Sequence, residues 1–410
     1  MTALLITNAH LLEPETGELS DSSWLEVADG RIADTGTGPA PAVAGDTAVI
    51  DAAGATVLPG LIDAHVHILL TTMDPHEALS WTPGYATVRA LAEAERMLRR
   101  GFTTVRDVGG ADYGMARAIN EGLALGPRLI FGGKALSQTG GHGDLRPASD
   151  ETLPCCQAAP NFARIADGVD AVRHAARDEF RKGAHHLKML LSGGVASPLD
   201  EVSAVQYSDD EMRAAVQEAD NHNRYLTVHA YHGRGVNRAL QAGARCVEHG
   251  NLIGDDTIAL LVEKDAFLVP TLVTYEQMYR FGKQAGLPEA SRRKVADVRD
   301  GGLVALEKAH KAGVNIVYGS DLLGPLHGAQ LDEFTLRAQV QEPIDIIRAA
   351  TVTAAKLLGM AGQIGTLNPG AHADLLVLDG NPLDDITTLT DPTRRLRYVV
   401  RAGQALPVAD

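Results

Sequence analysis

Leu58–His67 reads LPGLIDAHVH, a short apolar run that ends in two histidines two residues apart. In a β-strand, residues i and i+2 project to the same side. His65 and His67 are therefore expected to point together from the end of one strand. Two imidazoles on one side supply half of a metal site, although histidines at this spacing also occur on surfaces with no shared role. The missing donors must come from elsewhere in the chain.

The composition is that of a globular protein without affinity for polyanions. Of 410 residues, 45% are hydrophobic and 22% are charged, which are ordinary values. The formal net charge is −15 and no run of lysine or arginine occurs, so nucleic acid and anionic membranes are not expected partners. A chain of this length holds one large domain and a small one, or two of medium size.

The cysteines and the first residues predict a cytoplasmic protein. Cys155, Cys156 and Cys246 form neither a disulfide framework nor a zinc knuckle, so reduced thiols are expected. The start, MTALLITNAH, carries no basic segment, and its apolar run is too short for a secretory signal. No stretch approaches the ~20 apolar residues of a membrane span.

Both ends of the chain are rich in short strand patterns, whereas the middle alternates strand and helix. We therefore expect a small discontinuous β-sandwich domain, residues 1–56 and 361–410, around an inserted α/β domain at 57–360. The terminal strand candidates are Leu4–Ile6, Trp24–Val27, Arg31–Ile32, Ala48–Ile50, Asp374–Leu378 and Tyr398–Val400.

The middle segment contains eight strand candidates separated by helical patterns, which match a (β/α)8 barrel. One helix is expected to open with a capping box at Ser208–Glu211, and another to span Ile344–Leu358. A doubly wound sheet is the alternative, but no GxGxxG motif follows the first strand. The strand candidates are Val57–Ile62, Thr103–Arg106, Arg128–Phe131, His186–Leu190, Leu226–Val228, Cys246–Glu248, Phe267–Val269 and Asn315–Tyr318.

Six potential metal ligands lie at or near the carboxyl ends of these strands. Barrel enzymes gather their catalytic groups at that end, so the six are expected to converge on one mouth. Each alone has a plainer explanation, since a buried histidine is commonly a hydrogen-bonded core residue and an aspartate can cap a helix. The six are His65, His67, Lys188, His229, His249 and Asp321.

Lys188 cannot bind a cation in its ordinary charged form, because an ammonium group has no lone pair. A lysine that has been neutralised and carboxylated is a carbamate, whose two anionic oxygens can bridge two ions. The alternative is a buried lysine paired with a carboxylate. Nearby His185 and His186 are expected to be structural or to support the ligands.

The sequence resembles the amidohydrolase superfamily over nearly its whole length, and within it the Xaa-Pro dipeptidase (prolidase-like) branch. The narrower match rests on LSQTGGHGD (136–144), SGGVASP (192–198) and VPTLVTY (269–275). The superfamily match rests on LPGLIDAHVH, GFTTVRDVGG, LKMLLSGGVASP, VHAY, VEHGNLI, GSDLLG and IGTLNPGAHADLLVLDGNPLDD.

The resemblance implies two divalent metal ions, expected to be zinc, bridged by the carbamate of Lys188. The more buried ion would be held by His65, His67 and Asp321, and the more exposed ion by His229 and His249. A bridging hydroxide would attack an amide carbonyl, and Asp321 would pass its proton to the leaving nitrogen.

Substrate contacts are expected from residues near the ligands. Tyr231, two residues after His229, is the candidate for a hydroxyl aimed at the scissile carbonyl, with a packing role as the alternative. His142, in a glycine-rich loop, is a candidate for binding the substrate carboxylate or carbonyl, unless the loop is merely a connection. Tyr275 and Arg234 are weaker candidates, and Asp107 is expected to hold a loop or a helix end.

The resemblance favours a dipeptidase that cleaves the bond to a C-terminal proline. A hydrolase of another carboxylate-bearing amide, such as an N-acyl amino acid or an ochratoxin-like amide, is the alternative. A catalytically inactive scaffold is a third possibility, which the six filled ligand positions disfavour. The expected partners are a small amide or dipeptide substrate and further copies of the chain, because large barrels often assemble.

Overall fold

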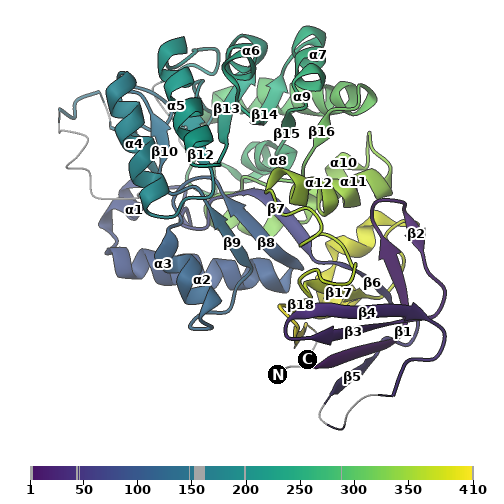
Figure 1. The fold of residues 1–410 in the computed structure, drawn as a ribbon. Helices are drawn as coiled ribbons and strands as arrows, with labels where there is room; N and C mark the ends of the chain where they lie inside the picture. Colours follow the sequence, from purple (N-terminus) through teal and green to yellow (C-terminus); the bar gives the residue numbers. More distant parts are fainter. Residues whose placement is uncertain are drawn as a thin grey trace.

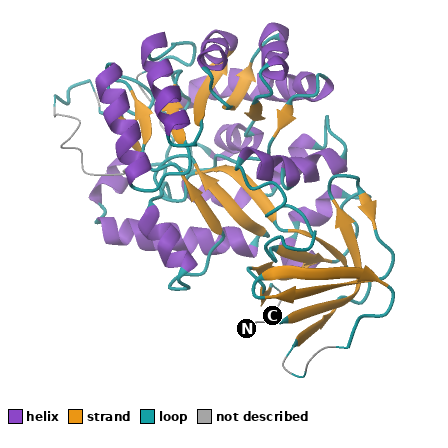
Figure 2. Ribbon diagram, viewed as in Figure 1, coloured by secondary structure: helices purple, strands orange, loops and turns teal. Residues whose placement is uncertain are grey.

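The computed structural model describes residues 3–42, 45, 47–146, 148–151, 162–197, 200–287 and 289–408. Its larger part is a barrel wrapped by helices, and its smaller part is a β domain beside which both chain ends lie (Figures 1 and 2). Cys246 is a buried free thiol, whereas Cys155 and Cys156 lie outside the described residues. None of the helices in the described ranges has the length and hydrophobicity to cross a membrane.

Eight strands form the barrel wall and confirm the (β/α)8 prediction. Strands β7, β8 and β9 pair in parallel, as do β12 to β16. Two backbone hydrogen bonds close the ring, from His185 N to Phe131 O and from Ala64 N to Tyr318 O, each at 2.9 Å. The strands are β7 (Leu61–Val66), β8 (Phe102–Asp107), β9 (Arg128–Phe131), β12 (Leu187–Leu190), β13 (Leu226–His232), β14 (Cys246–Leu252), β15 (Phe267–Val269) and β16 (Asn315–Ile316). Two further strands lie next to them: β10 (Ala135–Ser137) pairs with β12, and β11 (Ala163–Ile165) pairs with β10.

Helices cover the outside of the barrel (Figure 2). The predicted capping box is present at the start of α5, where Ser208 and Glu211 exchange side-chain to backbone hydrogen bonds. The helices are α1 (Pro75–Ser80), α2 (Pro83–Arg99), α3 (Tyr113–Asn120), α4 (Val169–Arg181), α5 (Asp209–Asn221), α6 (Gly233–Ala242), α7 (Asp255–Glu263), α8 (Leu272–Phe281), α9 (Glu289–Lys311), α10 (Asp332–Arg337), α11 (Pro343–Ala349) and α12 (Val352–Leu357), with the 3-10 helix η2 (Gly324–Ala329).

The single helix expected over Ile344–Leu358 is divided into α11 and α12 at Thr351, whose backbone is not helical (φ −138°, ψ −98°). The carbonyls of Ala349 and Ala350 accept hydrogen bonds from Tyr318 N and Ile62 N at 2.9 and 2.8 Å. Because these two carbonyls bond to the barrel wall, they do not continue the helical ladder.

The β domain draws strands from both ends of the chain. One nine-stranded sheet runs in the order β19-β18-β17-β6-β1-β3-β4, with β2 and β5 paired to β1. Its apolar side chains pack between the two ends of this sheet, so the sheet folds over its own core as in a sandwich. The strands are β1 (Leu4–Glu13), β2 (Glu18–Leu19), β3 (Ser23–Ala28), β4 (Arg31–Thr37), β5 (Ala48–Asp51), β6 (Thr56–Pro59), β17 (Leu375–Leu378), β18 (Leu396–Arg401) and β19 (Gln404–Pro407). Two short helices, η3 (Ile386–Thr390) and α13 (Pro392–Arg395), lie between β17 and β18 in the sequence.

The strand expected over Val57–Ile62 is divided at Gly60, with β6 in the β domain and β7 in the barrel. Gly60 N donates to Asp374 O at 2.8 Å. A Cβ at Gly60 would lie 2.1 Å from Thr103 Oγ1, so only glycine fits this close approach to β8. The chain thus passes from the β domain into the first barrel strand, which carries His65.

Candidate metal centre

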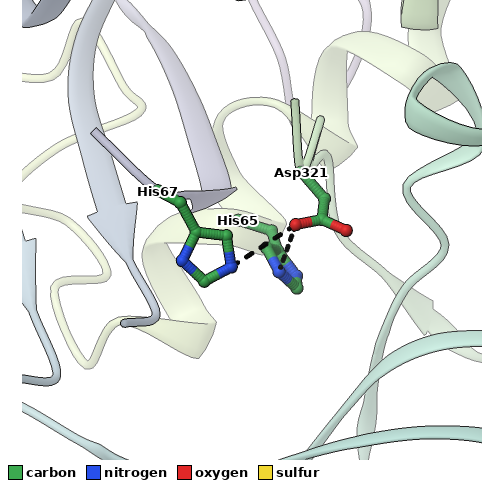
Figure 3. A group of neighbouring side chains, drawn as sticks. All are labelled: His65, His67 and Asp321. Carbon is green, nitrogen blue, oxygen red and sulfur yellow. Dashed lines mark ion pairs between the residues drawn. The ribbon is translucent and has the colours of Figure 1, made fainter. Parts of the chain in front are cut away.

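His65, His67 and Asp321 come together at one end of the barrel (Figure 3). His65 lies near the end of β7, His67 follows it, and Asp321 lies five residues beyond β16. Asp321 Oδ1 is 3.2 Å from His65 Nε2 and 3.4 Å from His67 Nε2. The Asp321 backbone N–H donates to the His65 carbonyl at 2.8 Å, which fixes the loop that carries the carboxylate against β7.

The hydrogen bonds of Nδ1 in His65 and His67 determine where each ring carries its proton, and therefore whether the Nε2 near Asp321 has a free lone pair. His65 Nδ1 lies 2.8 Å from Glu248 Oε2, and His67 Nδ1 lies 2.8 Å from the Gly109 carbonyl. Both partners are acceptors, so each Nδ1 carries the proton and each neutral ring turns an unprotonated Nε2 toward the carboxylate. Three acceptor atoms that face one another in this way suit a cation.

The electrostatics of this group also favour a positive charge. Burial acts to raise the pKa of Asp321, but the neighbouring histidines, His65 first, hold it well below its usual range. Burial acts to lower the pKa of His67, but Asp321 outweighs it and raises that pKa. A proton on a histidine or a bound metal ion would provide the positive charge that stabilises the ionised Asp321 carboxylate.

Lys188, His229 and His249 lie at the same end of the barrel, on β12, β13 and β14. All three are buried. The ring centroids of His229 and His249 are 4.5 Å apart, and those of His249 and His65 are 5.0 Å apart. Burial lowers the pKa of Lys188 to about 8, although the charges of Glu248 and Asp321 oppose the shift.

Both additional histidines have one nitrogen engaged with the protein. His249 Nδ1 lies 2.8 Å from Thr271 Oγ1 and 2.9 Å from the Tyr275 hydroxyl, which leaves Nε2 as its available nitrogen. His229 Nε2 lies 3.4 Å from the Gly193 carbonyl, which leaves Nδ1. Two histidines and a buried lysine therefore lie at the same end of the barrel as the His65, His67 and Asp321 group.

Three residues at or beside this site have a strained backbone. His249, Thr271 and Asp321 adopt positive φ angles of 75°, 45° and 52°, a region that residues other than glycine rarely occupy. Such strain costs of order 1–3 kcal/mol per residue and clusters at functional sites. The strained residues include two of the six candidate ligands and a hydrogen-bond partner of one.

A pair of buried charged residues contacts the candidate ligand His65 through Glu248. Glu248 accepts from Arg106 Nη2 at 2.6 Å as well as from His65, and Thr227 donates a further hydrogen bond to it. Burial acts to raise the pKa of Glu248, but the positive charges of Arg106, Lys188 and His65 hold it well below its usual range. Sequence reasoning missed Arg106 and Glu248 as supporting residues, although Glu248 directly precedes a proposed ligand in the VEHG segment.

Asp107 holds a loop, as expected. It accepts hydrogen bonds from the backbone N–H groups of Ile68, Gly109 and Ala111 at 2.8, 3.0 and 3.1 Å. This arrangement fixes the turn whose Gly109 carbonyl orients His67.

A cavity of about 780 Å³ opens onto the centre. Tyr231 and Tyr275 line it, and the Tyr275 hydroxyl donates to that of Tyr231 at 3.0 Å. The rest of the wall is largely apolar and includes Leu69, Met73, Trp81, Met115, Phe162, Val195, Met278, Leu287 and Leu323. A pocket of this size accommodates a substrate with a bulky apolar group.

The other sequence candidates separate into two groups. His142 and Tyr275 line the cavity. Arg234 is exposed on α6 and is not among the described residues of the cavity wall. His185 Nδ1 lies 3.3 Å from the Phe131 carbonyl oxygen, and the buried His186 stacks on Tyr225 with ring centroids 5.7 Å apart. Both histidines therefore pack against the strands of the barrel and are not among the described residues that line the cavity.

Comparison with known proteins gives a consistent family. A model described as the amidohydrolase family matches residues 56–406. The ochratoxinase of Aspergillus niger is 32% identical over 372 residues, covering 85% of this chain and 75% of that protein. A solved prolidase in complex with N-methylphosphonate-L-proline is 43% identical, with a TM-score of 0.96 over 99% of this chain and 100% of that one. A Xaa-Pro dipeptidase with methionine in its active site is 28% identical, with a TM-score of 0.89 over 99% and 100%.

Proposed function

This chain belongs to the amidohydrolase family and is an enzyme, and from that premise we propose that it cleaves an amide bond to a C-terminal amino acid, with Xaa-Pro dipeptides as substrates. The observation that carries the proposal is the convergence of three acceptor groups, His65, His67 and Asp321, beside a cavity. The likeness to a prolidase with a proline-derived ligand supports the substrate class.

We propose that this site takes two divalent cations, both zinc, of which the His65, His67 and Asp321 group fits one. His65, His67 and Asp321 would hold one ion and His229 and His249 the other, with a carbamate on Lys188 shared between them. Imidazole and carboxylate donors suit zinc. When bound, such ions activate a water molecule and polarise a carbonyl group.

The side chains around the centre have distinct roles in this proposal. Asp321 holds the proton released by the attacking water and delivers it to the leaving nitrogen, which a proline amide needs because an unprotonated amide nitrogen is a poor leaving group. Burial raises the pKa of Tyr231, so its hydroxyl keeps its proton and donates to the developing oxyanion. Tyr275 orients that hydroxyl by donating to its oxygen. His142 contacts the substrate from the cavity wall.

A second candidate substrate class is an N-acyl amino acid or an ochratoxin-like amide. The size and apolar lining of the cavity favour it, as does the 32% identity to an ochratoxinase. Such compounds share an acyl group, an amide and a free carboxylate with a dipeptide. A homo-oligomer and a cytoplasmic location stay predictions.

A panel of dipeptides and N-acyl amino acids, assayed with zinc-loaded protein and with protein treated with a chelator, tests the proposal. We expect turnover of Xaa-Pro dipeptides that the chelator abolishes and zinc restores. Turnover of aryl amides alone would replace the peptidase assignment with the second candidate. Absence of any amide hydrolysis, with much less than one metal ion per chain, would support an inactive scaffold.

A further inference from the structure

His142 is held by a chain of hydrogen bonds that leads away from the metal centre. Its Nδ1 lies 2.7 Å from the Ser197 hydroxyl, and Ser197 Oγ donates to Asp200 Oδ1. Ser197 and Asp200 are buried, and both His142 and Ser197 line the cavity. Two residues outside the ligand set thus form a path from a cavity side chain to a buried carboxylate.

The surroundings of Asp200 show that its carboxylate acts as an acceptor. Its Oδ2 accepts from Gly194 N at 3.2 Å and from Gln206 Nε2 at 3.0 Å. Lys294 Nζ lies 3.7 Å from Oδ1. These partners of the Asp200 carboxylate are all donors, so the carboxylate needs no proton of its own to bond with them.

The position of the protons follows from this arrangement. Ser197 has one hydroxyl proton, and its hydroxyl lies nearest to the Asp200 carboxylate. If that proton goes to Asp200, Ser197 must accept a hydrogen bond from His142, so Nδ1 of His142 carries a proton. The other ring nitrogen, Nε2, has no hydrogen-bond partner among the described residues, and His142 is one of the residues that line the cavity.

The packing around His142 restricts the plane of its ring. The ring stacks on His229, with centroids 4.4 Å apart and an interplanar angle of 24°. Gly194 also lies against the ring, because a Cβ at this position would come within 1.9 Å of His142 Cε1. The loop that carries Ser197 is fixed by Lys294, whose ammonium donates to Gly194 O at 3.2 Å and Ser197 O at 2.8 Å.

We propose that Ser197 and Asp200 are positioning residues that hold His142 with Nδ1 as the donor and Nε2 directed to the substrate. The proposal rests on the proposed function for the role of His142 as a substrate contact. Carboxylates commonly orient a functional histidine by hydrogen bonding. Here the Asp200 carboxylate orients His142 through the Ser197 hydroxyl, which lies between them.

Nitrogen-15 NMR of the zinc-loaded protein tests the proton position without any substrate. The His142 ring signals are assigned by their loss in His142→Gln. We expect a protonated Nδ1 in the unchanged protein and loss of that signature in Ser197→Ala and in Asp200→Asn. An unprotonated Nδ1 in the unchanged protein, or ring signals that neither substitution alters, would overturn the proposal. Because this readout needs no turnover, its result is separate from the outcome of the substrate panel.

Kinetics on whichever amide the panel identifies test the functional consequence. Ser197→Ala is expected to lower kcat/KM by about 10- to 100-fold, because a reacting geometry is sensitive to a displacement of ~1 Å, and Ser197→Thr, which keeps the hydroxyl, should recover most of it. Ser291→Ala is the matched control, since Ser291 Oγ donates to Ala196 O of the same loop at 3.3 Å and has no hydrogen bond to His142 among those of the described residues. An equal loss in Ser291→Ala, or no recovery in a folded Ser197→Thr, would reduce Ser197 to a loop anchor and contradict the proposal.

Discussion

Replacing Glu248 by glutamine tests how strongly metal binding at the candidate centre depends on the negative charge of Glu248. Glu248 is fully buried and accepts hydrogen bonds from Arg106 at 2.6 Å and from His65 Nδ1 at 2.8 Å. Glutamine has nearly the same shape but one acceptor oxygen and an NH₂ group. If the oxygen stays with Arg106, the NH₂ group meets the Nδ1–H of His65, and the bond that orients this ligand is lost.

The structure allows the size of two effects to be worked out. Removing the charge that pairs with a buried Arg106 costs about 3–5 kcal/mol of folding free energy. At about 2.1 cal/mol/K of unfolding entropy per residue, this lowers Tm by about 3–6 °C for a chain of this length. Loss of a supporting hydrogen bond behind a metal-bound histidine lowers metal affinity about 10- to 100-fold, which corresponds to about 1.4–2.8 kcal/mol.

Calorimetry gives the first quantity, and competition with a chromophoric zinc chelator gives the second. The matched control is Glu333→Gln, because Glu333 and Arg337 form an equally buried ion pair at 2.7 Å that is not among the residues of the metal centre. Both variants should lose stability, but only Glu248→Gln should lose metal affinity. Unchanged zinc affinity in Glu248→Gln, or an equal loss in Glu333→Gln, would refute the reasoning.

Three further predictions concern single side chains. Lys188→Ala should reduce the bound metal below two ions per chain and abolish activity, with partial recovery on addition of a short carboxylic acid; full activity with two ions bound would exclude the carbamate. Asp321→Asn should lower kcat by about 10²–10⁴-fold, measured at matched metal content, and a change of less than tenfold would remove Asp321 from proton transfer. Burial lowers the pKa of His327 to about 4 from its ordinary 6.5, so the unfolded chain binds the proton first and stability falls as pH drops from 6.5 toward 4. The loss is about 3 kcal/mol, and urea titrations at several pH values should show a flatter pH dependence in His327→Gln; an unchanged slope would contradict this assignment.

The elements with strong local patterns could be predicted from the sequence. The HxH pair at the end of an apolar run indicated β7, and the serine–glutamate pair that opens α5 indicated its capping box. The same strand and helix repeat placed His249 and Asp321 at the ends of predicted strands, whereas in the structure His249 lies within β14 and Asp321 lies five residues beyond β16. These features depend on residues close in the sequence, where periodicity and capping have a direct physical cause.

The features that depend on tertiary contacts were not predicted. One predicted strand is divided at Gly60 and one predicted helix at Thr351. The cause in each case is a hydrogen bond from a distant part of the backbone: Asp374 O accepts from Gly60 N, and Ile62 N donates to the carbonyl of Ala350, beside Thr351. Arg106 and Glu248 read as interior strand residues, and only the closed barrel brings them together. Ser197 and Asp200 lie in a loop without periodicity, so nothing local connects them to His142.

Diffraction from crystals of the metal-loaded protein, recorded on both sides of the zinc absorption edge, tests the central claim most directly. The account predicts two anomalous peaks in the barrel mouth, about 3.5–4 Å apart. One peak should lie between His65, His67 and Asp321, the other beside His229 and His249, with extra density on Lys188 Nζ between them. An absence of anomalous density at these side chains, or a single ion remote from Lys188, would contradict it.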